Sequence, residues 1–138
     1  MTAEDVKKLL RLVPHPREGG WYVRTYEAAE TVAAGAFEDA RYASARRTGT
    51  AIYYLLEPGT FSEMHRLKSD EVFHFYAGDA VEMLQLMPDG SGRTVVIGND
   101  LAAVAETSGC CGAECLAGLS VGGRRKVGAA GMHGEPWV

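Results

Sequence analysis

The sequence predicts an all-β fold, a β-barrel or jelly roll preceded by one short helix. From residue 50 onward the chain consists of short segments rich in β-branched and aromatic residues, at 50–56, 61–67, 71–77, 80–87 and 93–98. Turn residues such as Glu57, Pro58 and Gly59 separate these segments. Closely spaced strands joined by tight turns are typical of an antiparallel barrel. Because strands do not alternate with long helical patterns, a nucleotide-binding α/β fold is not expected.

The N-terminal part adds one helix and one strand. Apolar side chains recur at helical spacing over residues 2–12, with Thr2 as the N-cap and Pro14 and Pro16 as the stop. Residues 21–26 are aromatic or β-branched for the most part and predict a strand. Residues 27–48 show little periodicity, so we expect a loop with some helical content.

Composition limits the protein's class. A chain of 138 residues with 46% hydrophobic residues suits one domain with one core. The formal net charge of −4 argues against nucleic acid or an anionic membrane as partner, and favours a small-molecule ligand. No apolar run reaches the roughly 18 residues that a membrane span needs, and the first residues lack the features of a signal peptide. We therefore expect a cytoplasmic protein.

One motif stands out among the predicted strands. Gly59, His65, Glu71 and Gly78 follow the spacing G-x5-H-x5-E-x6-G, in which the glycines bracket a strand, a turn and a second strand. This spacing resembles the first motif of the cupin superfamily, whose His and Glu point into the barrel and can bind a metal. Leu67 stands where the usual motif has a second His. A divalent metal on His65 and Glu71 therefore stays open but is not expected.

Strand alternation places side chains independently of any family. If Glu71 faces the pocket, Phe73 and Phe75 face it too, while Val72 and His74 face the other way. His65 and Glu71 would then meet as a His-carboxylate pair. Such a pair binds a metal or moves a proton. The alternative is a buried pair that only orders the barrel.

The resemblance extends beyond this motif. The segments HPREGGWYVRTYE, TAIYYLLEPGTFSEMHRLKSDEVFHFYAGDAVEMLQLMPDG and VVIGNDLAA are similar, in order and spacing, to the DUF985 or cupin_5 family of RmlC-like cupins. The resemblance implies a jelly-roll barrel similar to sugar-nucleotide epimerases, commonly a homodimer. The pocket residues it implies are Arg24, Tyr26, His65, Asp70 and Glu71. We expect Phe73 and Phe75 to line the same pocket, and Arg24 either to bind an anion or to form a surface ion pair.

After Ala103 the resemblance ends. We therefore expect a cupin domain over residues 1–103 and an atypical tail over 104–138, rich in Gly, Ala and Cys, poorly ordered and lacking the barrel's last strands. Reading the codons one base later permits the strand-like RPVVVGPSAWQGS for residues 107–119 and RWALLGCTVSPGF for 126–138. Both are similar to segments of the family. Our hypothesis is a one-base frame error near residues 103–106.

The cysteines of this tail suggest reduced thiols. Cys110, Cys111 and Cys115 are odd in number, which a disulfide framework would not be. With His133 they lack the paired C-x2-C spacing of a zinc site, so zinc is not expected.

Three functions fit this sequence. The first is an epimerase-like or isomerase-like enzyme, with His65 as the proton-transfer base, Glu71 orienting it and Arg24 holding an anionic group of the substrate. The second is a non-catalytic barrel that binds a metabolite. The third is a metal-dependent cupin oxygenase with His65 and Glu71 as ligands, against which Leu67 counts. The substrate cannot be derived from these spacings.

Overall fold

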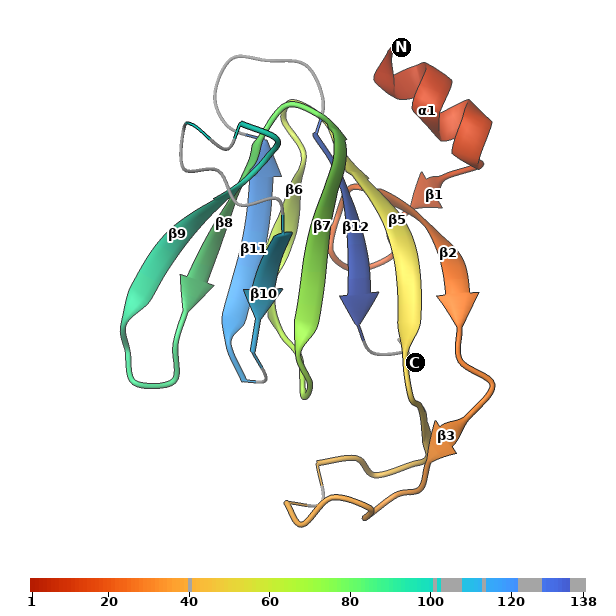
Figure 1. Cartoon of the computed structure of the whole chain (residues 1–138), viewed down its shortest axis with the longest axis vertical. Helices are drawn as coiled ribbons and strands as arrows, with labels where there is room; N and C mark the ends of the chain where they lie inside the picture. Colours follow the sequence, from red (N-terminus) through yellow and green to blue (C-terminus); the bar gives the residue numbers. More distant parts are fainter. Residues whose placement is uncertain (40, 101, 103–107, 113, 122–127, 135–138) are drawn as a thin grey trace.

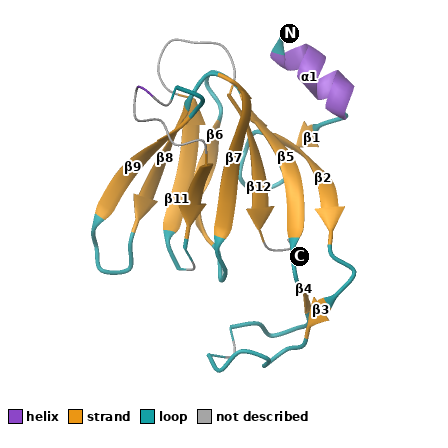
Figure 2. Cartoon of the chain, in the orientation of Figure 1, coloured by secondary structure: helices purple, strands orange, loops and turns teal. Residues whose placement is uncertain are grey.

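Two antiparallel sheets form the body of the protein in a computed structural model. The structure describes residues 1–138 except 40, 101, 103–107, 113, 122–127 and 135–138. The larger sheet has the strand order β1-β2-β5-β12-β7-β10 and the smaller one β6-β11-β8-β9 (Figure 1). A two-stranded ribbon, β3 (Thr31–Val32) with β4 (Arg46–Arg47), extends from one end (Figure 2). This is the jelly-roll barrel that the sequence predicts.

The strands lie where the alternating segments predict them. The larger sheet comprises β1 (Val13–Pro14), β2 (Trp21–Glu27), β5 (Thr50–Leu56), β7 (Glu71–Gly78), β10 (Ser108–Cys111) and β12 (Gly128–Gly134). The smaller sheet comprises β6 (Phe61–Arg66), β8 (Val81–Leu86), β9 (Gly92–Ile97) and β11 (Leu116–Val121). The five strands expected between residues 50 and 98 are thereby confirmed, each to within about two residues at either end.

The core lies between the inner faces of the two sheets. Strand β8 shows the alternation clearly, since Val81, Met83 and Gln85 are buried and the residues between them are exposed. Buried side chains from both sheets form one apolar cluster, which includes Tyr54 of β5, Phe73 of β7 and Leu119 of β11. This cluster supplies most of the hydrophobic stabilisation, and its members Cys115 and Ala117 lie beside the polar group described below.

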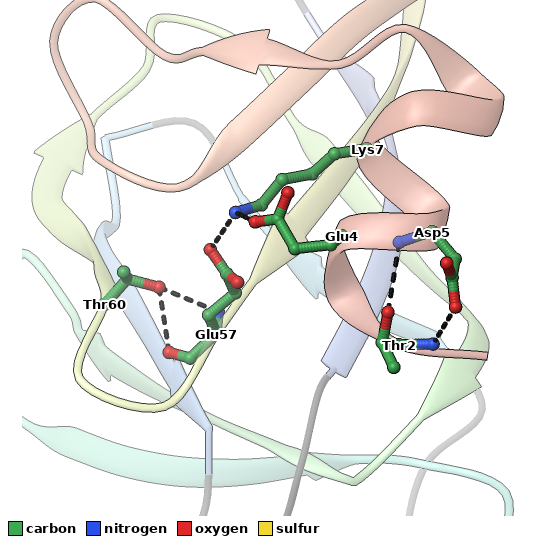
Figure 3. A network of polar contacts seen from close by, with 6 residues as sticks. All are labelled: Thr2, Glu4, Asp5, Lys7, Glu57 and Thr60. Carbon is green, nitrogen blue, oxygen red and sulfur yellow. Dashed lines mark hydrogen bonds and ion pairs between the residues drawn. The ribbon is translucent and has the colours of Figure 1, made fainter.

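The predicted N-terminal helix is confirmed as α1 (Ala3–Leu10). Thr2 and Asp5 form a capping box, in which each side chain accepts a hydrogen bond from the other residue's backbone N–H (Figure 3). Lys7 joins the helix to the barrel, because its Nζ lies 2.7 Å from a carboxylate oxygen of Glu57 and 4.0 Å from the centre of the Trp21 ring. Within the described residues no helix is long and apolar enough to cross a membrane.

Two regions differ from the sequence-based expectation. Residues 27–48 contain turns and the short ribbon β3–β4, and their described part has no helix. The tail was expected to leave the barrel without its last strands, yet the structure has β10, β11 and β12 there. β11 pairs with β6 and β8, and β12 lies between β5 and β7. Backbone hydrogen bonds need no large side chains, so segments rich in Gly and Ala can complete a ladder. The domain boundary at residue 103 stays a prediction.

Strand β11 shows why small residues fit in the tail. A Cβ atom built on Gly118 would lie 2.8 Å from the Met64 sulfur and 2.8 Å from the Ser62 carbonyl oxygen. The backbones of β11 and β6 therefore approach each other too closely for a side chain at this position. Ala117 and Leu119 on either side are buried.

Candidate functional site

Three titratable side chains meet inside the barrel. His65 of β6 lies with Nε2 3.7 Å from an oxygen of Glu71, the first residue of β7. The same Nε2 lies 3.8 Å from Oε1 of Glu18, which belongs to the connection between β1 and β2. The side chains of Glu18 and Glu71 are only 5% and 3% exposed, and that of His65 is 15% exposed. The predicted His65–Glu71 pair is thus present, with a second carboxylate beside it.

Backbone contacts hold Glu18 in this position. Its carbonyl oxygen accepts a hydrogen bond of 2.8 Å from the N–H of Glu63 in β6. Its N–H donates to Nδ1 of His15 at 3.0 Å. Tyr54 donates its hydroxyl proton to the Gly19 carbonyl oxygen at 2.7 Å. The segment 15–20 is therefore attached to β5 and to β6, which directs the Glu18 side chain towards His65.

Two glycines after Glu18 make this path possible. Gly19 and Gly20 have φ values of +82° and +67°, in the left-handed region. A Cβ atom on Gly19 would lie 2.5 Å from the Phe61 carbonyl oxygen, and one on Gly20 2.9 Å from the Leu55 carbonyl oxygen. Larger residues would push the segment off the barrel, so the Glu-Gly-Gly sequence has a direct structural reason.

The hydrogen bonds of His65 determine its tautomer. Nδ1 lies 2.8 Å from the backbone carbonyl oxygen of Glu63, and a carbonyl oxygen only accepts. Nδ1 therefore carries a proton, and Nε2 is the atom that faces Glu18 and Glu71. If Nε2 and both carboxylates were unprotonated, three acceptors would face one another. At least one proton is therefore shared among Nε2 of His65 and the carboxyl groups of Glu18 and Glu71.

The pKa values of Glu18, Glu71 and His65 are all raised above their ordinary values. Burial raises the pKa of Glu18 to about 7, against the opposing charge of His65. Burial also raises the pKa of Glu71, which the nearby His65 imidazole at 3.7 Å opposes. For His65 burial lowers the pKa, but the nearby carboxylates of Glu71 and Glu18 and the hydrogen bond with the Glu63 carbonyl oxygen together raise it to about 9. Near neutral pH an imidazolium therefore lies beside the Glu18 carboxyl group, which is close to titrating, and beside Glu71, whose pKa is also raised.

A narrow cleft reaches this cluster. Its empty space is about 170 Å³, and His65, Glu71, Leu67, Cys115 and Ala117 line it together with Gly112. The cleft has no room for a water-sized sphere. Leu67, which stands at the position where the cupin motif has a second His, forms part of the wall of this cleft. His65 and Glu71 face the cleft, and Glu18 lies behind them.

The other predicted site residues lie elsewhere. Phe73 is fully buried in the apolar cluster and Phe75 packs against it; neither is among the described residues that line the cleft, and their role in a ligand pocket stays a prediction. Arg24 is partly exposed and pairs with Glu27 at 2.7 Å, while Tyr26 is 56% exposed. Asp70 lines a different cavity, described below. Arg24, Tyr26 and Asp70 are not among the described residues that line the cleft, and their roles in substrate binding stay predictions.

Sequence reasoning missed Glu18. It lies within the quoted segment HPREGGWYVRTYE but received no role. The available signal was the pair of glycines after an acidic residue, which indicates a close approach of the backbone to the barrel.

The expectation about a divalent metal on His65 and Glu71 stays a prediction. Among the described residues no group of three or more His, Cys, Asp or Glu side chains is arranged to hold a metal ion. Cys115 is a buried free thiol. The side chains of Cys110, Cys111 and His133 lie outside the described part of the structure, so the expectation about zinc is untested there.

The barrel and its inward-facing His and Glu define a protein of the cupin class, and comparison with known proteins gives the family. The chain matches the family described as Cupin superfamily (DUF985), Cupin_5, over residues 4–125, and it belongs to that family. The match extends past residue 103, where the resemblance seen in the sequence ends. No curated protein matches the chain.

Solved structures agree with this assignment. A hypothetical protein from Leishmania major is 28% identical, with a TM-score of 0.85 over 96% of this chain and 80% of its own. A protein from Shewanella oneidensis is also 28% identical, with a TM-score of 0.83 over 96% of this chain and 77% of its own. Oxalate decarboxylase from Bacillus subtilis is 17% identical, with a TM-score of 0.58 over 91% of this chain but 28% of its own. At that identity the last comparison shows the shared fold alone.

Proposed function

We propose that the barrel binds a small, carbohydrate-like molecule beside His65 and catalyses proton transfer on it, as an epimerase or isomerase does. The observation that supports this proposal is the position of His65 Nε2 between two buried carboxylates, at 3.7 and 3.8 Å, with Nδ1 held by a carbonyl oxygen. Buried titratable groups with strongly shifted pKa values are typical of acid-base sites.

The order of proton transfers follows from the protonation states. With a pKa of about 9, His65 begins the reaction as an imidazolium at neutral pH, so it acts first as an acid rather than as the base predicted from the sequence. Glu71 faces the cleft and removes a proton from the carbon next to a substrate carbonyl group. As that C–H bond breaks, its electron pair forms the C=C bond of an enol, and the carbonyl oxygen takes the proton of His65 Nε2. A proton then returns to carbon while an enol hydroxyl group gives its proton back to His65 Nε2 and becomes the carbonyl group again. Return to the opposite face of the same carbon gives an epimer, and return to the other carbon of an enediol gives an isomer.

Glu18 is a positioning residue in this scheme. It lies behind His65 and its charge raises the pKa of the imidazole. When Glu71 has taken up the carbon-bound proton and the substrate oxygen has taken the proton of His65 Nε2, the cluster has gained one proton and lost one. The cluster thus changes its proton distribution with little change in total charge, which favours transfer in a buried site.

A non-catalytic metabolite-binding barrel is the second candidate, and a buried cluster that only orders the fold is the alternative that the narrowness of the cleft favours. With no room for a water-sized sphere, the cleft must widen before a substrate reaches Nε2. A barrel whose buried cluster only orders the fold would need no such opening.

The test is exchange of carbon-bound protons in D2O, followed by NMR. A panel of aldoses, ketoses and 2-hydroxy ketones is incubated with the protein, and loss of the proton next to the carbonyl is measured. We expect exchange in at least one member, and a fall of about 10²- to 10⁴-fold in its rate for His65→Gln. His74→Gln is the matched control, because His74 lies on β7 next to Phe73, which is buried in the core, so that its side chain points to the other face of the sheet.

Two results would count against the enzyme. Absence of exchange across the panel, together with a bound metabolite detected by mass spectrometry after purification, would favour the non-catalytic barrel. Equal exchange rates for wild type and a folded His65→Gln variant would remove His65 from the mechanism.

A further inference from the structure

A larger cavity lies outside the barrel interior. Its volume is about 620 Å³, within the range of small-molecule sites. Residues of the segment 32–50, which contains the ribbon strand β4, form one wall. Ser69, Asp70 and Val72, at the turn into β7 and its start, form the other.

This cavity is separate from the cleft at His65. Successive side chains of a strand point to opposite faces of its sheet. Glu71 lines the cleft, whereas its neighbours Asp70 and Val72 line the larger cavity. The two share no lining residue among those described, so a ligand in one does not occupy the other.

Guanidinium groups are prominent in its lining. Arg47 donates through Nε to Glu27 at 2.8 Å and through Nη1 to the Ala29 carbonyl oxygen at 2.9 Å. These two contacts fix the side chain, and a guanidinium has five N–H donors, so within the described structure Arg47 keeps donors for a ligand.

Arg41 is fixed in a comparable way. Its Nε donates to Asp39 at 3.0 Å and its Nη1 to the Lys68 carbonyl oxygen at 3.2 Å. Lys68 in turn donates from Nζ to the Arg41 carbonyl oxygen at 2.6 Å. These reciprocal contacts join the loop to the turn before β7, so the two walls of the cavity are held together. A preorganised site loses less entropy on binding.

Aromatic rings lie next to the arginines. Phe37 and Tyr42 contact each other edge to face, with 5.7 Å between ring centres. The Arg41 guanidinium carbon lies 4.8 Å from the centre of the Phe37 ring, and that of Arg46 5.9 Å from the centre of the Tyr42 ring. Phe37, Tyr42 and all three arginines belong to the lining. The wall can therefore contact an apolar, planar group and an anionic group at once.

The local charge favours an anion. The lining contains Arg41, Arg46 and Arg47 against the single carboxylate Asp70. Glu27 and Asp39 offset part of this charge, but Glu27 is shared with a fourth arginine, Arg24. The described lining itself thus carries three guanidinium groups and one carboxylate, in a chain whose formal net charge is −4. A local excess of positive charge on an acidic protein is what an anion site requires.

We propose that this cavity is a second binding site, for a small organic anion that carries a phosphate or carboxylate group on a planar, apolar body. The arginines bind the anionic group, and Phe37 and Tyr42 contact the planar body. The site is independent of the proton chemistry proposed for His65.

Isothermal titration calorimetry with phenyl phosphate tests the proposal on the full chain. Inorganic phosphate and phenol serve as the two halves of the probe, and benzoate replaces the phosphate group by a carboxylate. We expect phenyl phosphate to bind more tightly than either half. Arg47→Gln and Arg46→Gln should each weaken its Kd by roughly ten- to a hundred-fold, the effect of losing a charge-assisted hydrogen bond.

Arg66→Gln is the matched control. Arg66 is exposed, lies 3.7 Å from Glu114 and does not line the cavity, so its removal should leave the Kd unchanged. His65→Gln should also leave it unchanged, which separates this site from the cleft. Absence of binding by phenyl phosphate and benzoate, or equal affinity in wild type and both cavity variants, would overturn the proposal. So would loss of binding in His65→Gln alone.

Discussion

The proton on His65 Nδ1 governs what the neighbouring carboxylates can do. Because this proton is held by the Glu63 carbonyl oxygen, all exchange must occur at Nε2. Two buried carboxylates and one imidazole then share a small number of protons in surroundings of low polarity, where an unpaired charge is costly. Glu18 Oε1 has no hydrogen-bond donor within 3.5 Å among the described residues and depends on the more distant imidazole. A group arranged in this way is sensitive to pH.

Stability should fall as the pH rises from about 5 to 9. The pKa of His65 rises from its ordinary 6.5 to about 9 on folding, so its stabilising effect is complete below pH 6.5 and is lost as the pH passes through 9. Glu18 acts in the same direction, because its pKa rises from 4.5 to about 7 and burial of its ionised form becomes unfavourable over that range. Thermal melts across this range measure the effect.

The variant His65→Gln gives this prediction its control. It should flatten the decline of Tm above pH 7, whereas His74→Gln should keep the wild-type slope. A Tm that is constant or rises between pH 6.5 and 9 in the wild type would show that His65 is not held as an imidazolium.

The two carboxylates should both contribute to the pKa of His65. Each lies within 4 Å of Nε2, and removal of an opposite charge at such a distance lowers a pKa by about one to three units. We therefore expect Glu18→Gln and Glu71→Gln each to lower the pKa of His65, measured by NMR titration of its ring. Glu63→Gln changes an exposed side chain and leaves the carbonyl oxygen in place, so it should have little effect. A pKa unchanged in Glu18→Gln would mean that Glu18 has no part in the cluster.

At the scale of elements, the segment 15–20 places the third group of the site. Its hydrogen bonds with Tyr54 of β5 and Glu63 of β6 hold it against both strands. The backbone can follow this path only where two consecutive residues adopt left-handed conformations close to carbonyl oxygens. The precision of the Glu18 position therefore depends on Gly19 and Gly20.

Gly19→Ala should destabilise the protein by more than about 2 kcal/mol. A left-handed conformation alone costs a residue with Cβ about 1–2 kcal/mol, and the new atom would lie 2.5 Å from the Phe61 carbonyl oxygen. Gly59→Ala is the matched control, since Gly59 has a similar φ of +85° but no atom within 4 Å of its Cβ position. Urea unfolding should show a loss of about 1 kcal/mol for the control. Equal losses for the two variants would show that the close approach to β6 does not restrict Gly19.

The sequence predicts the elements better than it predicts the site. Alternation and turn residues locate β5 to β9 because each strand is half-buried and bounded by Gly, Pro or Asp. Alternation also places Glu71 and Phe73 on one face. It carries no information on Glu18, which reaches His65 from a segment 47 residues earlier in the chain through backbone contacts. The cavity at Arg47 could not be predicted either, because residues 27–48 have no periodic pattern from which the positions of their side chains follow.

At the scale of the whole molecule, the barrel depends on its last strands. β12 lies between β5 and β7 in the middle of the larger sheet, and β11 lies between β6 and β8 in the smaller one. Yet the sequence of β12 is GAAGMHG, with three glycines and two alanines. Such residues have low β-propensity and offer little apolar surface to a core. Central strands of a barrel are ordinarily rich in large apolar residues, so the composition of β12 does not suit its central position in the sheet.

A one-base shift of the reading frame would resolve this conflict, because it would place apolar residues where the structure has strands. In the shifted reading the four positions of β10 become PVVV and the seven positions of β12 become ALLGCTV. Each buried Val or Leu gained adds about 1.5–3 kcal/mol, so the shifted chain should be more stable than the present one by several kcal/mol.

Sequencing the coding DNA across residues 98–138 tests this directly, and we expect one base gained or lost near residues 103–106. Urea unfolding of both chains tests the physical argument independently of the gene, with the chain that ends at Ala103 as control. If the DNA keeps the present frame and the two full-length chains unfold at the same urea concentration, the small residues of β12 suffice for a closed barrel. In that case backbone pairing with β5 and β7, rather than side-chain burial, would hold the last strand in place.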